Sequence, residues 1–494
     1  MKNLISITAL FFALGCSHSI KAPIEKNKFV KLTSYSEIID FVKQSKVRNK
    51  LIDIEYFAVS AEGKNIPALT ISKDNFTNSN KIRVMIFAQQ HGDEQSGKEG
   101  LLLLLNDIAT GNLDYLFDRL DVILVPQVNP DGSEKDTRRN GNNVDLNRNH
   151  LVLSESETTG LHELFYKYLP DATLDVHEYF PYSKDWLEYG YLKNYDEQIG
   201  TLTNPNVSSN IVKMQKEEYL KYINDYLTKS GFSYNEYIVG GPPQMNRIRY
   251  STIDVNDGRQ SFGILNSFSF IQEGKNGTNS LENIEHRTRG QYQGMKGFLQ
   301  YLYNNSREIK SLVKRERDKL INPSLDEDIV IRMEHVKGDS PVMIKLKSIS
   351  TGEDSIFKVD DFNSKICTYL EVKKPKGYLL PKTDTKLKAL IDKHHMKYSE
   401  FTANKNESIV QYHILDMKKS IDEEDEHFDP VVKEEVVVNL DTSHYYYVQT
   451  NQLASNLIVI AFEPQSMLGI SQYADYNYLF EKEKYPILKV VEIK

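Results

Sequence analysis

The stretch Val84-Met85-Ile86-Phe87-Ala88 decides the fold, because it is a compact apolar run of strand length that leads directly into polar residues. Three further runs of this kind lie at Asp121–Val128, Ala172–Val176 and Ile264–Ile271. Helical patterns alternate with these runs at Lys98–Ile108, Ser154–Tyr168, Asn210–Lys229 and Leu281–Tyr303. Apolar strands that alternate with helices are typical of a sheet buried on both faces. We therefore predict an α/β fold with a mixed, largely parallel sheet flanked by helices.

Polar residues follow these predicted strands at four places. His91, Asn129, His177 and Glu273 each come within a few residues of a strand. In open α/β sheets, functional residues gather at the carboxyl ends of the strands. The pattern predicts that these residues share one site.

The segment His91-Gly92-Asp93-Glu94 has an imidazole and a carboxylate three residues apart. A tight turn after the strand can direct both toward one point, and zinc binds both ligand types. A catalytic zinc site needs a third protein ligand, and His177 is the best candidate because it ends another strand of the sheet. His162 and His286 fall on predicted helices and are expected to be surface or core residues.

The motifs between the candidate ligands carry a resemblance. They are Asn129-Pro130-Asp131-Gly132, Arg138-Arg139-Asn140 and Val144-Asp145-Leu146-Asn147-Arg148-Asn149. In this order, and with a later Glu273 closing a strand, the sequence resembles the zinc carboxypeptidase family, which includes carboxypeptidases A, B and E. The resemblance covers roughly residues 30–305. Asn143 stands where many members have glycine, and asparagine tolerates a left-handed backbone better than most residues.

The resemblance implies a role for each matching residue. It implies one zinc ion held by His91, Glu94 and His177, with Glu273 as the general base. It further implies that Arg138 polarises the scissile carbonyl, that Asn147 and Arg148 bind the C-terminal carboxylate of the substrate, and that Tyr250 caps the substrate. Tyr234 and Tyr237 are alternatives to Tyr250. A planar guanidinium suits a carboxylate in a way that lysine cannot match.

Substrate preference depends on a segment about 15 residues before Glu273. Family members place the floor of their specificity pocket there, and this chain has Asp257 and Arg259 in that segment. We expect one of these two charges to set the preference for the terminal residue.

The resemblance implies a zinc-dependent exopeptidase that removes C-terminal residues from peptides. A close variant acts on cell-wall peptides, which also end in a free carboxylate, and the motifs do not separate the two. Two alternatives remain open. One is a deacylase of N-acyl amino acids on the same scaffold, and the other is a non-catalytic binding lipoprotein.

The first residues predict a targeting segment. Lys2 precedes the apolar stretch Leu4–Leu14, which is too short to span a bilayer. Ala13-Leu14-Gly15-Cys16 resembles the bacterial lipobox, which implies a signal peptide over residues 1–16 and lipidation of Cys16. We expect a tether over 17–30 and a lipid-anchored protein of the bacterial cell envelope, at the outer membrane facing the periplasm or the exterior.

The length of 494 residues predicts more than one domain. We expect a catalytic domain over 31–305 and a β-rich accessory region over 306–494, in which Tyr445-Tyr446-Tyr447 packs within a strand. The net charge of −8 and the lack of a dense basic run argue against nucleic-acid binding. After removal of the signal, Cys367 is the one cysteine left, so no internal disulfide can form.

Overall fold

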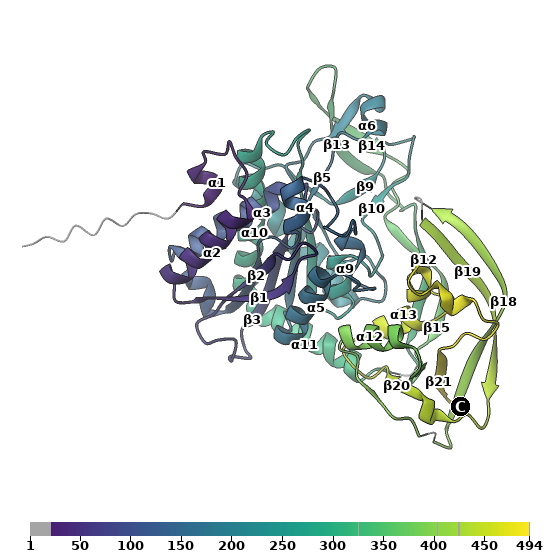
Figure 1. Ribbon diagram of the computed structural model, residues 1–494. Coiled ribbons are helices and arrows are strands. Elements are labelled where there is room, and N and C mark those ends of the chain that lie inside the picture. The colour runs from purple at the N-terminus through teal and green to yellow at the C-terminus, as the bar shows by residue number, and fades with distance from the viewer. Residues whose placement is uncertain (1–20, 325, 403, 423–424, 494) are drawn as a thin grey trace, which may run out of the picture.

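The computed structural model describes residues 21–493, apart from 325, 403, 423 and 424 (Figure 1). The predicted signal segment Leu4–Leu14 and the lipidation site Cys16 lie outside the described residues. Lipid attachment and location in the cell envelope therefore stay predictions. No helix in the described part of the chain combines the length and apolar character needed to cross a membrane.

An eight-stranded mixed sheet forms the centre of the fold. Its strands, in spatial order, are β1 (Ile52–Val59), β2 (Asn65–Ile71), β4 (Leu120–Val125), β3 (Ile82–Ala88), β5 (Ala172–Tyr179), β11 (Phe268–Lys275), β7 (Glu197–Gly200) and β8 (Tyr234–Glu236). The four central strands β4, β3, β5 and β11 run parallel to one another. The strands β1 and β2 pair antiparallel with their neighbours, and β7 is antiparallel to β11 but parallel to β8. The predicted fold class, with its largely parallel centre, is confirmed.

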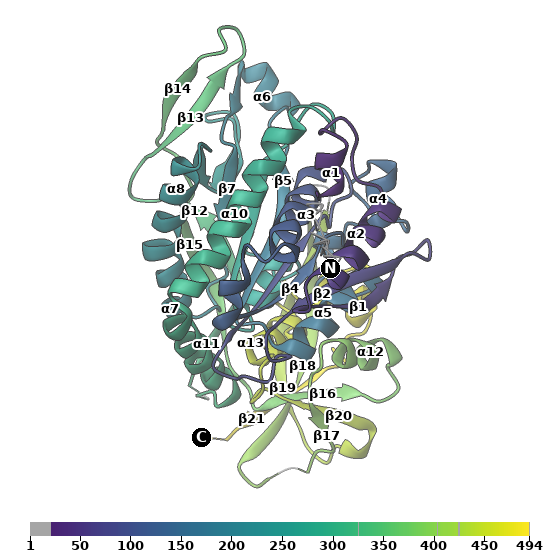
Figure 2. The same ribbon diagram turned by 90° about the vertical axis from the view of Figure 1, so that its left-hand side faces the viewer.

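Helices cover both faces of this sheet. Figure 2 shows α3, α8 and α10 lying together over one face. On the other face, the rings of Phe165 in α5 and Phe262 in α9 stack with centroids 4.6 Å apart. The helices are α1 (Pro23–Lys26), α2 (Tyr35–Arg48), α3 (Gln95–Ala109), α4 (Pro130–Lys135), α5 (Ser156–Tyr168), α6 (Lys184–Tyr189), α7 (Ser209–Met214), α8 (Leu220–Lys229), α9 (Gly258–Gly263), α10 (Ile284–Asn304), α11 (Ser306–Ile321), α12 (Thr385–Lys393) and α13 (Ser455–Phe462).

Strand alternation decides which side chains of β5 face which helices. A Cβ on Gly97 of α3 would lie 2.9 Å from Val176, so Val176 faces α3. A Cβ on Gly258 at the start of α9 would lie 2.5 Å from a carboxylate oxygen of Asp175. Because successive side chains of a strand point to opposite faces, His177 shares the α9 face with Asp175. Both glycines allow a close approach of helix to strand that a larger residue would prevent.

The C-terminal part is rich in strands, as expected. It contains β12 (Asp328–Val336), β13 (Val342–Ser348), β14 (Asp354–Val359), β15 (Lys365–Lys373), β16 (Gly377–Pro381), β17 (Tyr398–Ser399), β18 (Glu407–Asp422), β19 (Asp425–Val437), β20 (Tyr445–Gln449) and β21 (Leu488–Glu492). The last six of these strands form one sheet, in which β18 and β19 make a long hairpin (Figure 1). Tyr447 is buried in β20 against Phe401, so packing within a strand explains it.

Two short pairings complete the strand list. The strand β6 (Tyr191–Lys193) joins β13, and β9 (Ile238–Gly240) pairs with β10 (Ile248–Tyr250). The first of these pairings connects the two parts of the chain, because β13 comes from the predicted accessory region and β6 from the predicted catalytic domain.

The structure differs from the sequence-based expectations at three places. Residues expected to form a tether pack from Ala22 onward, with Ile24 fully buried in α1. The helix α11 follows residue 305 and packs against β3, and Lys310 forms an ion pair with Asp171 at 2.8 Å. The division at residue 305 stays a prediction, but α11 belongs to the layers around the large sheet.

The third difference concerns strand ends. The strands β5 and β11 continue to Tyr179 and Lys275, so His177 and Glu273 lie within strands and not after them. In the parallel register Glu273 is the partner of His177. Polar side chains are tolerated inside these buried strands because they face one another at the site described next.

Candidate metal centre

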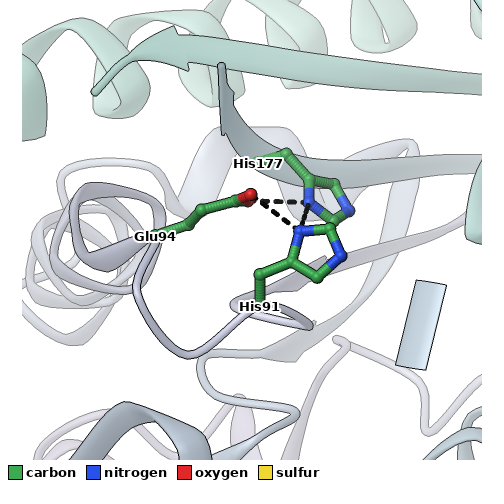
Figure 3. Close-up of side chains that lie close together, drawn as sticks. All are labelled: His91, Glu94 and His177. Carbon is green, nitrogen blue, oxygen red and sulfur yellow. Dashed lines mark hydrogen bonds and ion pairs between the residues drawn. The ribbon is translucent and has the colours of Figure 1, made fainter. Parts of the chain in front are cut away.

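Three side chains converge at the carboxyl ends of the central strands (Figure 3). His91 follows β3, Glu94 is the residue before α3, and His177 lies in β5. Nδ1 of His91 lies 2.7 Å from Oε1 of Glu94, and Nδ1 of His177 lies 2.8 Å from Oε2. The two Nδ1 atoms are 3.2 Å apart. The predicted trio is therefore brought together, although 83 positions separate Glu94 from His177 (177 − 94).

This geometry fits a zinc ion. The three ligand atoms all lie within 4.8 Å of one another, and among the described residues no other group of metal-binding side chains comes together in this way. Ligands bonded to tetrahedral zinc at about 2.0–2.2 Å lie about 3.4 Å from one another. The observed separations are slightly shorter than that, so a small outward movement of the side chains accommodates the ion.

Two further aspartates orient the imidazoles. Nε2 of His91 donates a hydrogen bond to Asp145 at 3.1 Å, and Nε2 of His177 lies 2.9 Å from Oδ1 of Asp175. A carboxylate beside Nε2 holds the proton there and leaves the Nδ1 lone pair free for a metal. Sequence reasoning did not assign this role to either residue. The signal was available, because Asp175 precedes His177 by two residues on a strand and so shares its face.

The protonation of the two histidines depends on the surrounding carboxylates of Glu94, Asp145 and Asp175. Burial by itself lowers the pKa of His91, but Glu94 and Asp145 outweigh it and the pKa lies above its usual value. For His177, burial is likewise outweighed by Asp175 and Glu94, and the pKa lies well above its usual value. Burial raises the pKa of Glu94, but the two imidazoles have the larger, opposite effect. The pKa of Glu94 therefore lies below its usual value, and the carboxylate stays ionised. The site thus concentrates negative charge at the point where the three ligands meet.

The Asn129–Gly132 motif supports the turn that carries His91 and Glu94. Asn129 caps α4 by accepting a hydrogen bond from the Gly132 amide at 2.8 Å, and its amide donates to the Gln90 carbonyl at 3.1 Å. A Cβ on Gly92 would lie 2.1 Å from the Gly132 backbone, which only glycine permits. The motif therefore acts as a scaffold for the ligands.

The arginines predicted to bind substrate lie beside the ligands. Nη1 of Arg138 lies 3.1 Å from Nδ1 of His91, and Nε donates to Asp145 at 3.0 Å. Arg148 is exposed, and Asn147 is buried beside it. Asn143 has a φ of +63°, as its left-handed tolerance predicted. The structure thus leaves one arginine at the ligand atoms and a second one open to solvent.

Glu273 lies next to His177 on the adjacent strand. Burial, together with the charge of Glu94, raises its pKa to about 7, against opposing effects of His177, Tyr237 and His91. A carboxyl group with a pKa near neutrality can both accept and donate a proton under physiological conditions.

Of the three candidate tyrosines, Tyr237 reaches Glu273 and Tyr250 does not. The Tyr237 hydroxyl donates to the Glu273 carboxylate. The ring of Tyr250 lies 4.9 Å from that of Phe362, and its hydroxyl bonds to Glu236. Tyr250 pairs with Ile238 in the β9–β10 ladder, so it faces away from the side that Tyr237 occupies. Tyr237, and not Tyr250, therefore lies beside Glu273, and the expectation for Tyr250 does not fit its position.

Asp257 and Arg259, which were expected to set specificity, bond to other groups of the protein. Asp257 caps α9 through the Gln260 amide at 2.5 Å and pairs with Arg259 at 3.0 Å. Arg259 is fully buried, and it also donates to the carbonyls of Thr201 and Thr252, each at 3.1 Å. Both side chains therefore hold the end of β7 and the start of α9 in place, and their charges are paired with each other.

Comparisons with known proteins agree with this site. Residues 38–172 match the family described as zinc carboxypeptidase. Carboxypeptidase 2 of Trichophyton tonsurans is 23% identical over 451 residues, which cover 87% of this chain and 81% of the relative. Carboxypeptidase D of Drosophila melanogaster is 34% identical over 114 residues, which cover 19% of this chain and 8% of the relative. The matched family segment contains His91 and Glu94 but ends before His177.

Solved structures of similar proteins include two carboxypeptidases. A metallo-carboxypeptidase from Burkholderia cenocepacia is 18% identical with a TM-score of 0.43, covering 56% of this chain and 71% of the other. Carboxypeptidase A from Helicoverpa armigera is also 18% identical with a TM-score of 0.43, covering 58% and 75%. Residues 38–172 are thus similar to the zinc carboxypeptidase family, and together with carboxypeptidase relatives that align over 87% of the chain and the three convergent ligands they support a zinc-dependent peptide hydrolase.

Proposed function

We propose that the protein removes C-terminal residues from peptides at a single zinc ion held by His91, Glu94 and His177. The observation that carries the proposal is the position of Glu273, which lies next to His177 in the strand register and has a pKa near 7. A proton-transferring carboxyl group beside a three-ligand metal site is the arrangement that amide hydrolysis requires.

The division of labour follows from the contacts. Zinc supplies Lewis acidity, which polarises a carbonyl and lowers the pKa of water. Glu273 takes a proton from the attacking water and delivers it to the departing amine. Tyr237 donates a hydrogen bond to Glu273 and so holds this carboxylate in one orientation.

Arg138 is placed to stabilise the charge that develops on the carbonyl oxygen. Its guanidinium is fixed by Asp145, and its Nη1 lies 3.7 Å from Oε1 of Glu94, directly beside the ligand atoms. A preorganised donor at such a position contributes roughly 10²- to 10³-fold to turnover.

Arg148 and Asn147 give the preference for a free terminus. Arg148 is exposed, while its Nη1 donates to the Asn147 carbonyl at 2.8 Å. Asn256 donates to the Arg148 carbonyl, which fixes the backbone at this point. A guanidinium on a fixed backbone can bind a terminal carboxylate in a bidentate manner, and it offers no comparable partner to an amide in mid-chain.

The proposal is tested by digesting a peptide library with wild type and Glu273→Gln, with the products read by mass spectrometry. We expect wild type to release single C-terminal residues, and the variant to lose roughly 10²- to 10⁴-fold in turnover while it retains zinc. Glu282→Gln is the matched control, because Glu282 is a partly exposed carboxylate that follows the same strand and bonds to Thr278.

The same peptides with a C-terminal amide test the role of Arg148. We expect these amides to resist wild type, because they lack the charge that the guanidinium binds. Internal cleavage, or equal turnover by wild type and Glu273→Gln, would overturn the proposal. Faster turnover of N-acyl amino acids than of every peptide would favour the deacylase instead.

A further inference from the structure

Lys193 is a buried ammonium group without a carboxylate partner. It ends β6 and is 7% exposed. Its Nζ donates a hydrogen bond to the Ile238 carbonyl at 3.3 Å. The ring centroids of Tyr179 and Trp186 lie 5.3 and 6.0 Å from Nζ. Within the described residues, no aspartate or glutamate forms an ion pair with it, whereas Arg138 is paired with Asp145 at 2.9 Å.

Two residues that contact Lys193, Tyr179 and Ile238, are close in sequence to residues of the metal centre. Tyr179 lies two residues beyond His177 on β5. Ile238 is the neighbour of Tyr237, whose hydroxyl bonds to Glu273. Burial lowers the pKa of Lys193 to about 8, and the one opposing influence is the charge of Glu273. Lys193 is therefore a cation within the electrostatic field of the catalytic carboxylate, yet outside the set of groups that perform the reaction.

Such a residue is costly to keep. Burying an ammonium group without an opposite charge is strongly unfavourable. Two cation–π contacts compensate only part of this penalty. A methionine would fill the same space without the penalty. A buried cation that has no ion-pair partner and lies near the proposed catalytic carboxylate is best explained by a carboxylate that arrives from outside.

The position of Lys193 depends on the C-terminal part of the chain. Lys193 is the strand partner of Leu346 in β13. The next two residues are held as well, since Asn194 donates to Asp354 at 2.7 Å and the Tyr195 hydroxyl accepts from the Lys345 amide at 2.5 Å. Trp186, Leu192 and Leu346 belong to one hydrophobic cluster. Figure 1 shows β13 and β14 beside α6, on the side of the molecule away from the C-terminal sheet.

The terminal carboxylate of a substrate has a different partner. Arg148 contacts Asn147 and Asn256, and neither of these residues contacts Lys193. Arg148 and Lys193 therefore have separate surroundings and can bind two different anionic groups.

We propose that Lys193 is a specificity-determining residue that binds an aspartate or glutamate side chain of the peptide, and that the β13–β14 hairpin holds it in position. This inference rests on the proposed exopeptidase function and names the peptides that it acts on best. The hairpin thereby gives the C-terminal region a role in substrate selection.

The test is a matched set of peptides that carry glutamate or glutamine at the terminal, penultimate or third position. For wild type, we expect the ratio of kcat/KM for glutamate over glutamine to be about tenfold at one of these positions. Lys193→Met abolishes that ratio, and Lys193→Arg retains most of it. The position that responds identifies which residue of the substrate Lys193 binds.

Lys347→Met is the control variant. It removes the same charge from the same pair of strands, but Lys347 pairs with Leu192 and so points to the other face. Zinc content and the thermal midpoint of Lys193→Met should match wild type or exceed it, because a buried charge has been removed.

The two proposals fail in distinguishable ways. If wild type shows no preference for glutamate, or if Lys193→Met leaves the ratio unchanged at every position, the role of Lys193 is wrong while release of residues from the glutamine peptides still supports the exopeptidase. If no peptide of either series loses a C-terminal residue, the exopeptidase proposal itself fails.

Discussion

Two groups of buried histidines in this protein differ in the side chains that surround them. The first is the metal cluster of His91, Glu94 and His177. The second, which we name the aromatic cluster, consists of His150, His162 and His394. The imidazoles of both groups are at most 3% exposed, so burial does not distinguish them.

The metal cluster is surrounded by carboxylates. Besides Glu94, Asp145 and Asp175 contact its imidazoles at 3.1 and 2.9 Å. Their charges raise the pKa values of both histidines in spite of burial. The cluster therefore favours a positive charge, whether a proton or a metal ion.

The aromatic cluster has rings and backbone groups around it. His162 lies 4.9 Å from the ring of Phe262 and 5.4 Å from that of His394. Nδ1 of His150 lies 3.2 Å from Nε2 of His162, and Nε2 of His394 donates to the Leu151 carbonyl at 2.7 Å. Burial lowers the pKa of both His150 and His394 to about 4. The charge of Asp175 opposes this change at His150, and the hydrogen bond to Leu151 opposes it at His394, but neither outweighs burial. This cluster excludes a positive charge.

The comparison teaches that carboxylates, and not imidazoles, select the place where the metal binds. Gln90 joins the two clusters, because its amide donates to Asp175 at 2.9 Å and its carbonyl accepts from His150 at 2.8 Å. The clusters are thus close in space and opposite in charge preference.

The largest expected effect comes from replacing one histidine of each cluster with alanine. His177→Ala should lose stoichiometric zinc and at least roughly a thousandfold in kcat/KM, because two ligands do not retain the ion. His162→Ala should retain full zinc and lose stability through the cavity it creates. Elemental analysis and turnover measure both variants. Zinc loss in His162→Ala would contradict the conclusion that the metal binds at the metal cluster and not at the aromatic cluster.

A smaller effect is expected when a carboxylate next to the metal cluster loses its charge. Asp145→Asn keeps a hydrogen-bond acceptor for His91 but removes the negative charge. We expect the affinity for zinc to fall by about 10- to 100-fold, measured by competition with a chelator. Asp121→Asn is the control, because Asp121 is a fully buried carboxylate in β4 that bonds to Ser72 and Lys81. Equal loss in both variants would mean that burial of charge matters more than its contact with the ligand.

The smallest expected effect concerns the pH dependence of stability. The folded-state pKa of His394 is about 4, below the ordinary value of 6.5, so the unfolded chain binds more protons at pH 5 than the folded chain does. The free energy of unfolding should therefore fall as the pH drops from about 6.5 to about 4. His394→Gln should remove about 2 kcal/mol of the loss between pH 7.5 and pH 5.

Urea unfolding of both proteins in chelator measures this change without interference from zinc release. The glutamine amide can still donate to the Leu151 carbonyl, so the variant tests titration and not the hydrogen bond. An unchanged pH dependence in His394→Gln would show that His394 is not excluded from protonation in the folded state.

Much of the centre of the fold could be predicted because its signals are local. Apolar runs of strand length predicted β3, β4 and β5 within a few residues, and the helical pattern predicted α10. The helix α9 was missed because its sequence, Gly258–Gly263, begins and ends with glycine and is held by the cap from Asp257. The helix α11 was also missed, although Ile309, Leu312, Val313 and Leu320 have helical spacing and are buried. There the many charged residues obscured an amphipathic pattern.

The sequence by itself determined the ligand residues, because the order of the motifs around His91, Glu94 and His177 is a local and readable property. Only the tertiary structure decided which tyrosine lies beside Glu273, that Asp257 and Arg259 are already paired, and that Lys193 lies near the site. These facts depend on strand register and on contacts between residues as far apart as Lys193 and Leu346. The physical reason is that burial and pairing of a charge depend on neighbours brought from elsewhere in the chain, which sequence spacing does not encode.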